Sequence, residues 1–117
     1  MLKIGSERLN GVYSLTVSGR LDSSTGDELE QVVQSLPAED KRLILIDLTG
    51  VTHMDTKGLG QIAFSQRDIQ KAAGRACWIV SPKQTQVMGK LTSSGIIAML
   101  ELCDSVIDGY KMLIADL

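Results

Sequence analysis

The sequence of 117 residues contains a single histidine, two cysteines, two prolines and few aromatic side chains. With only His53 available, a zinc site built from several histidines is excluded, and no G-x-S-x-G sequence supplies a hydrolase nucleophile. Neither of the two common glycine-rich phosphate-binding loops, G-x-x-x-x-G-K-[ST] and G-x-G-x-x-G, occurs. The residues name no reaction, so we expect a protein that is not an enzyme and that holds no cofactor or metal.

Aromatic and basic residues are too sparse for nucleic-acid recognition. Single-stranded nucleic acids need stacking platforms, and the chain has only four aromatic residues. Its net charge is −2, and the 12 basic residues are scattered rather than clustered. No apolar run reaches the roughly 18 residues of a membrane span, and the start lacks a signal-peptide pattern. We therefore expect a cytoplasmic protein with no nucleic-acid partner and no direct membrane insertion.

Length and composition indicate one globular domain over residues 1–117, because 44% of the residues are hydrophobic and 22% are charged. Cys77 and Cys103 belong to no C-x-x-C pair, and we expect both to be buried free thiols. Trp78 lies in an apolar run and is expected in the core.

The first third of the chain predicts a β-hairpin followed by a helix. Leu2, Ile4 and Leu9 indicate a first short strand that ends at Asn10-Gly11, and the residues from Val12 to Ser18 alternate as a second strand. Asn-Gly is a strong signal for a two-residue hairpin turn. Apolar residues then recur at helical spacing from Leu29 to Leu36, and Pro37 ends that helix. The spacings Ser24 to Asp27 and Thr25 to Glu28 both fit a capping box at its start.

The middle of the chain predicts a buried strand, a loop and a second helix. Leu43 to Ile46 has no polar break, which is typical of a strand covered on both faces. Asp47 and the polar residues up to Thr52 supply turn chemistry, and Asp55 or Thr56 can cap the helix that follows. The inward stripe of this helix comprises Leu59, Ile62, Ala63, Gln66, Ile69, Ala72 and Ala73, and Gly74 is its expected stop.

Shorter elements complete the chain. We expect a strand from Ala76 to Val80, a helix that Gly95 ends, and a short strand between Met99 and Leu102. Asp104 is expected to cap a last helix that carries Val106, Ile107, Tyr110, Met112, Leu113 and Leu117. The order ββαβαβα(β)α predicts an α/β fold, with a mixed, mainly parallel sheet of four to five strands packed against about four helices.

The stretch from Asp47 to Gly60 reads D-L-T-G-V-T-H-M-D-T-K-G-L-G and resembles the signature of STAS domains, the anti-sigma factor antagonist family. That signature runs roughly D-L-S-x-V-x-x-M-D-S-[ST]-G-L-G. The stretch from Gly19 to Asp22, G-R-L-D, is similar to a second pattern of the family. The expected element order agrees as well, so the resemblance spans essentially the whole chain.

The resemblance implies a regulatory binding module. In that family, a partner protein kinase that is also an anti-sigma factor phosphorylates the hydroxyl residue after M-D. The unphosphorylated antagonist binds this partner and releases the sigma factor, and a PP2C-type phosphatase resets the switch. Carried onto this chain, the phosphoacceptor is Thr56. The partner-binding residues so implied or inferred are Asp22, Ser23, Ser24, His53, Met54, Asp55, Thr56, Lys57, Gly58, Gly60 and Phe64.

Two residues depart from the family pattern. Thr56 stands where serine is commoner, and Lys57 stands where a small hydroxyl residue is usual. A cation at that position attracts a phosphate, pairs with Asp55, or marks a different partner. On local chemistry alone, Asp55 and Thr56 are helix caps, and one residue can serve both as cap and as switch. Phe64 is expected opposite the apolar stripe, either as a partner anchor or as an isolated surface apolar residue.

Two classes of function remain open from the sequence. The first is the phosphorylation-switched antagonist, which we expect to be a monomer or a weak dimer. The alternative is a STAS scaffold subunit of a stress-signalling complex, or a cytoplasmic accessory of a membrane transport system. Particle size distinguishes the two, because a scaffold belongs to a much larger assembly.

Overall fold

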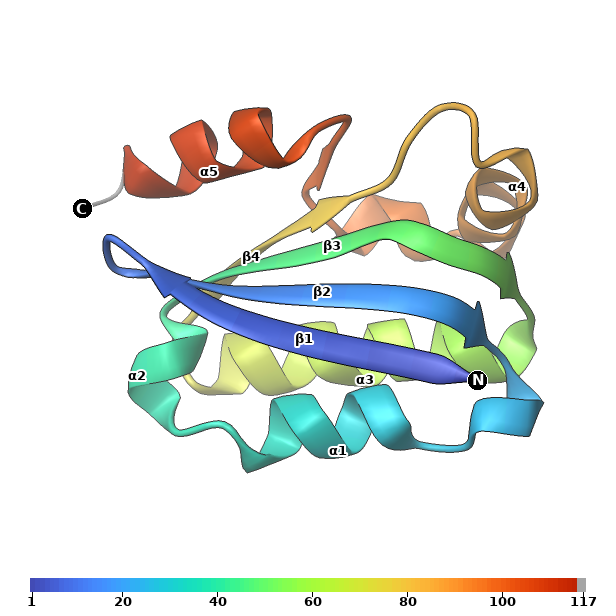
Figure 1. The fold of residues 1–117 in the computed structure, drawn as a ribbon, viewed down its shortest axis with the longest axis horizontal. Coiled ribbons are helices and arrows are strands. Elements are labelled where there is room, and N and C mark those ends of the chain that lie inside the picture. Colours follow the sequence, from blue (N-terminus) through green and yellow to red (C-terminus); the bar gives the residue numbers. More distant parts are fainter. Residues whose placement is uncertain (116–117) are drawn as a thin grey trace.

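The computed structural model describes residues 1–115, which form a five-stranded sheet with helices on both faces (Figure 1). The strands are β1 (Leu2–Leu9), β2 (Val12–Leu21), β3 (Leu43–Met54), β4 (Arg75–Ile79) and β5 (Leu102–Cys103). They lie in the order β1-β2-β3-β4-β5, with β1 antiparallel to β2 and every other pair parallel. The predicted mixed, mainly parallel sheet is confirmed.

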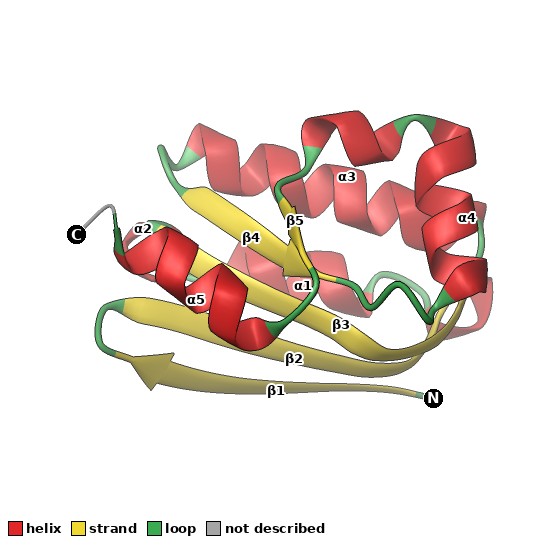
Figure 2. Cartoon of the chain, turned by 90° about the horizontal axis from the view of Figure 1, so that it is seen from above, coloured by secondary structure: helices red, strands yellow, loops and turns green. Residues whose placement is uncertain are grey.

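The helices divide between the two faces of the sheet. The elements α1 (Glu28–Ser35), α2 (Ala38–Lys41) and α3 (Thr56–Lys71) cover one face, and α5 (Val106–Ile114) crosses the other (Figures 1 and 2). The helix α4 (Thr85–Ser94) packs near the end of β3, and 3₁₀ turns span Ser23–Thr25 and Ile96–Met99. The four predicted helices are present. The additional α2 has only four residues, too few to show a hydrophobic period. No helix within residues 1–115 has the length and apolar character needed to cross a bilayer.

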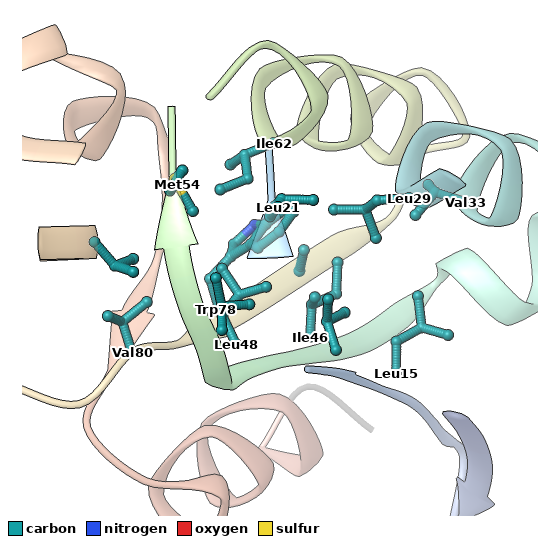
Figure 3. Close-up of a cluster of buried hydrophobic side chains, with 14 of the residues drawn as sticks. Leu15, Leu21, Leu29, Val33, Ile46, Leu48, Met54, Ile62, Trp78 and Val80 are labelled. Atoms are coloured by element: carbon teal, nitrogen blue, oxygen red, sulfur yellow. The ribbon is translucent and has the colours of Figure 1, made fainter. Parts of the chain in front are cut away.

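Residues of β3 alternate between two hydrophobic cores, which explains why its sequence has no polar break. Ile44, Ile46 and Leu48 enter the larger core between the sheet and α1 and α3 (Figure 3). Leu43 and Leu45 enter the smaller core beneath α5. Side chains alternate along a strand, so a strand covered on both faces must be apolar at every position. The prediction of a doubly covered central strand is confirmed.

The opening hairpin forms as predicted. Leu9 pairs with Val12, and the two residues between them, Asn10 and Gly11, have φ angles of 49° and 85°. Positive φ at both positions is the type I′ geometry that fits the twist of the flanking strands, and Asn and Gly reach it at little cost.

The predicted loop after Ile46 is wrong, because β3 continues to Met54. The strand absorbs its polar residues in a bulge: Thr16 of β2 pairs with Asp47, whereas Ser18 pairs with Gly50. The Asp47 carboxylate accepts hydrogen bonds from the Thr49 amide and hydroxyl. Turn-forming residues therefore mark an irregular strand here rather than its end.

The helix starts differ from the predicted caps. The capping box forms between Asp22 and Thr25 around the first 3₁₀ turn, so the boxes proposed at Ser24 and Thr25 are wrong. The cap residue of α1 is Asp27, whose side chain makes no capping hydrogen bond. Ser105, rather than Asp104, caps α5. Several neighbouring polar residues are suited to cap each helix, and the backbone conformation determines which of them becomes the cap residue.

The ends of the later helices and the position of the last strand agree with the prediction only in part. The helix α3 ends at Lys71, and Ala73 lies beyond it, exposed and at φ 60°. Gly95 ends α4 in the left-handed conformation, as predicted. The short strand predicted between Met99 and Leu102 is misplaced: Met99 ends a 3₁₀ turn, and β5 comprises only Leu102 and Cys103. Leu117 lies outside the described residues.

The aromatic and sulfur residues of β4 lie on opposite faces of the sheet. Trp78 is fully buried in the larger core, as predicted, and its indole N–H donates to the Gln66 side chain. Cys77 and Cys103 are free thiols, but only Cys77 is buried. Their Sγ atoms lie 3.2 Å apart, a contact that the sequence did not predict.

Candidate functional site

The neighbouring parallel strands β2 and β3 end side by side. Leu21, the last residue of β2, pairs with Met54, the last residue of β3. An aspartate follows each strand directly, Asp22 after β2 and Asp55 after β3, and each caps the helical segment that it precedes. Carboxyl ends of parallel strands are where ligand sites in open α/β sheets tend to form. The two segments that carry most of the predicted site residues thus meet at one edge of the molecule.

The carboxylate of Asp55 joins these two segments. One oxygen accepts the Gly58 amide of α3 at 3.1 Å, and the other accepts the Ser23 amide at 3.0 Å. The hydrogen bond from Ser23, followed by that from Gly58, lowers the pKa of Asp55 against the opposing effect of desolvation. Asp55 therefore remains ionised at neutral pH, and it holds the Ser23 segment against the start of α3.

Asp22 organises the adjacent 3₁₀ turn. Its carboxylate accepts the amide and the hydroxyl of Ser24, and the Arg20 guanidinium donates to the other oxygen at 2.7 Å. The hydroxyl of Ser24 is the largest of the influences that lower the pKa of Asp22. The whole residue is only 3% exposed. Asp22 thus supports the loop from within, while Ser23 and Ser24 lie exposed on its surface.

Thr56 is the first residue of α3 and is exposed. The helix behind it has 16 residues, and its positive dipole end points toward this position. Thr56 therefore lies on the surface of the molecule, at the positive end of this helix.

Lys57 does not pair with Asp55. Its Nζ lies 2.5 Å from Asp27 at the start of α1, and both side chains are about half exposed. The hydrogen bond and the charge of Asp27 raise the pKa of Lys57. The pairing with Asp55 that the sequence left open is therefore wrong in this structure, and Lys57 instead links the starts of α3 and α1.

The two glycines of the motif have different structural roles. A Cβ added at Gly58 would lie 2.0 Å from the carbonyl oxygen of Leu21, so only glycine lets α3 begin this close to β2. At Gly60, by contrast, no other part of the described chain comes within 4 Å of such a Cβ, and the residue is exposed. Gly60 therefore leaves the surface open one turn of the helix beyond Thr56.

The remaining predicted site residues are spread around this centre. Met54 is fully buried, whereas His53 in β3 and Phe64 in α3 are partly exposed. The Gln86 side chain of α4 binds both backbone groups of Met54, accepting from its N–H at 2.9 Å and donating to its C=O at 2.6 Å. No local pattern indicated a role for Gln86 or for the Asp27 carboxylate, because their partners come from distant segments. Within residues 1–115, no three His, Cys, Asp or Glu side chains are grouped in a way that suits a metal ion.

Comparison with known families decides the classification. A model of the STAS domain matches residues 3–109. The protein belongs to the STAS domain family. The recognition made from the stretch Asp47 to Gly60 is thereby confirmed.

Solved structures share this STAS fold over nearly the whole chain. An anti-sigma factor antagonist from Mycobacterium paratuberculosis is similar with a TM-score of 0.83 at 21% identity, covering 97% of this chain and 94% of that one. The anti-sigma factor antagonist SpoIIAA in its unphosphorylated form gives a TM-score of 0.69 at 16% identity, with 98% and 100% coverage. The phosphorylated form of SpoIIAA, from Bacillus, gives 0.64 at 15% identity, with 94% and 98% coverage. At these identities the likeness establishes the fold.

Proposed function

We propose that this STAS domain is an anti-sigma factor antagonist, a non-enzymatic binding module that phosphorylation of Thr56 switches off. Unphosphorylated, it binds an anti-sigma factor that is also a protein kinase, and the sigma factor is released. A PP2C-type phosphatase restores the binding form. The exposed position of Thr56 at the start of α3 supports this proposal most directly. The phosphorylated and unphosphorylated forms of SpoIIAA show that a protein of this fold undergoes such a modification.

The proposed binding surface surrounds Thr56. Its exposed members are Ser23, Ser24, Lys57 and Gly60, and partly exposed residues border them: His53, Asp55 and Phe64. Asp22, Met54 and Gly58 are buried, so we propose that they support the structure of this surface and do not contact a partner directly. The Asp55 carboxylate fixes the two halves of the surface relative to each other through Ser23 and Gly58.

A phosphate on Thr56 acts on binding more than on folding. At a helix N-terminus a dianion gains about 0.3–1 kcal/mol from the dipole when exposed, and the negative charge of Asp55 opposes part of this gain. At an interface, the same two charges meet a closely approaching partner, where like charges or uncompensated desolvation cost several kcal/mol. Phosphorylation therefore weakens association without unfolding the domain.

The decisive experiment is incubation with a candidate anti-sigma kinase and ATP, followed by mapping of the modified residue by mass spectrometry. We expect phosphate on Thr56, none on the Thr56→Ala variant, and loss of kinase binding after modification. Absence of phosphate on Thr56 with every candidate kinase would contradict the switch. Isolation of the protein in a megadalton or transporter-bound particle would support the scaffold alternative instead.

A further inference from the structure

The strand β1 is an unpaired edge of the sheet. It has eight residues, and within residues 1–115 its only neighbour in the sheet is β2; Figure 2 shows it as the outermost strand. The opposite edge is β5, which has only two residues. Very short edge strands avoid unwanted pairing, whereas a long free edge exposes backbone groups that can pair with another strand. β1 therefore needs either a protecting feature or a partner.

The hairpin register shows which backbone groups of β1 are free. The Arg20 amide donates to the Met1 carbonyl, and the pair Leu9 and Val12 flanks the two-residue turn. In an antiparallel ladder, hydrogen-bonded pairs alternate with non-hydrogen-bonded ones, so the odd-numbered residues of β1 bond to β2. The N–H and C=O groups of the even-numbered residues, Leu2 to Arg8, therefore point away from the sheet.

The charges on β1 complement each other rather than repel a second copy. Lys3 and Glu7 are exposed and make no ion pair within residues 1–115, whereas Arg8 is already bound to Asp40 at 2.7 Å. Lys3 and Glu7 stand symmetrically on either side of Gly5. Side chains of odd-numbered residues share one face of the sheet, since Glu7 and Leu9 border the groove beneath α5 while Ile4 borders the groove beside α1. Edge charges that prevent pairing place like charges opposite each other, whereas an antiparallel pair centred on Gly5 places Lys3 opposite Glu7.

We propose that β1 pairs antiparallel with β1 of a second copy, about a twofold axis at Gly5, to form one continuous sheet across a homodimer. A twofold axis perpendicular to the sheet places the α1 faces of both copies on the same side of the continuous sheet. Directly opposed residues point to the same side, so both must be odd-numbered or both even-numbered. Of the registers this allows, the one centred on Gly5 places Lys3 opposite Glu7 of the second copy, twice. It also places the outward backbone groups of Ile4 opposite those of Ser6. Gly5 then faces Gly5 in the closer, non-hydrogen-bonded type of pair.

The structure leaves room for this partner strand. A groove of about 450 Å³ runs beside β1 on the α1 face, lined by Ile4, Glu28, Gln31, Val32 and Ser35. The Ile4 and Ser6 side chains of the second copy would point into this groove. A strand pair alone buries less area than a stable dimer needs, so the association is weak and depends on concentration. The inference does not rest on Thr56 or on the proposed function, because it uses only the free edge of β1. The start of that strand does lie beside the end of β2, where the Arg20 amide donates to the Met1 carbonyl.

The test is sedimentation velocity of the full chain between about 10 µM and 1 mM at low salt, with charge-reversal variants. Lys3→Glu and Glu7→Lys each turn two attractive cross-strand pairs into two repulsive ones, and we expect each to weaken dimerisation at least about tenfold. The double variant Lys3→Glu/Glu7→Lys restores opposite charges across the axis and should recover the dimer. High salt should weaken the wild-type dimer, because the pairs are exposed.

Hydrogen exchange on the wild-type protein identifies the surface independently of any variant. The amides of Ile4 and Ser6 should exchange fast at low concentration and slow as the dimer forms, while those of Lys3 and Gly5 are protected throughout by β2. A monomer at 1 mM, or exchange at Ile4 and Ser6 that does not depend on concentration, would overturn the proposal. So would a dimer that single charge reversals leave intact or that the double variant fails to restore.

Discussion

Replacing the two glycines of α3 one at a time tests how the candidate site is built. Alanine at position 58 brings a Cβ to 2.0 Å from the Leu21 carbonyl oxygen, far inside van der Waals contact. The obstacle is backbone rather than a flexible side chain, so either α3 or the end of β2 must move by more than 1 Å. Such overpacking costs about 1–3 kcal/mol. We therefore expect Gly58→Ala to lower the free energy of unfolding by about that amount.

Gly60→Ala is the matched control, because it makes the same chemical change two residues further along the same helix. Among the described residues, no neighbouring group comes within 4 Å of a Cβ at this position. Alanine is favoured over glycine in a helix interior by about 0.8–1.0 kcal/mol, so Gly60→Ala should be neutral or stabilising. With the full helix-propensity gain at position 60, the two variants should differ by about 2–4 kcal/mol in stability, and overpacking at position 58 is what makes the two effects opposite in sign.

Urea denaturation followed by circular dichroism measures this difference. With a slope of about 1–3 kcal/mol per molar urea, the two midpoints should lie about 1 M or more apart. Equal slopes would show that native packing, not the compactness of the unfolded chain, has changed. A Gly58→Ala variant as stable as the wild type, or a Gly60→Ala variant destabilised to the same degree, would refute the close approach of α3 to β2.

Three further predictions concern the switch residue, the thiol pair and the acidic caps. Thr56→Asp should keep the melting temperature within a few degrees yet abolish binding to the anti-sigma kinase in a pull-down, while Thr56→Ala should keep binding; normal binding of the Thr56→Asp variant would contradict the switch. Burial, followed by the hydrogen bond to Cys103, raises the pKa of Cys77 from 9.0 to about 12. At pH 8 Cys103 should therefore react with a thiol reagent well before Cys77. Because the folded state retains the Cys77 proton, stability should also fall as the pH rises from about 9 to 12, and Cys77→Ala should lose this dependence. The pKa values of Asp22 and Asp55 lie below the usual 3.8, so their contribution to stability is present above that pH and is lost as the pH falls further. Asp55→Asn should flatten this acid limb in urea titrations.

Local patterns in the sequence predicted most of the architecture. The Asn10-Gly11 turn, the uninterrupted apolar run from Leu43 to Ile46 and the stop at Gly95 each carry their own physical signal. The errors arose where a polar residue could serve two purposes. Asp47 accepts turn-like hydrogen bonds from Thr49, as an aspartate in a turn would. These bonds form inside a bulge of β3, however, and β3 continues beyond the bulge, where Ser18 of β2 pairs with it.

The arrangement of the site was less predictable than its location. The motif placed Asp55, Thr56 and Lys57 at the start of a helix, which the structure confirms. No local pattern could show that Asp55 also accepts the Ser23 amide or that Lys57 pairs with Asp27, because these partners stand about 30 positions away in the sequence. Contacts of that kind depend on the side-by-side ending of β2 and β3, which exists only once the sheet has formed.

These contacts determine where the charge of a phosphate on Thr56 would act. The backbone donors most suited to an anion at this helix start, the amides of Gly58 and Ser23, are already bound to Asp55. The cation next in sequence, Lys57, is engaged by Asp27. A phosphate on Thr56 therefore finds its local partners occupied and gains little by folding back onto the domain. Its charge would be left facing outward, where the proposed binding partner must approach, and for this reason we expect a modification here to change association rather than stability.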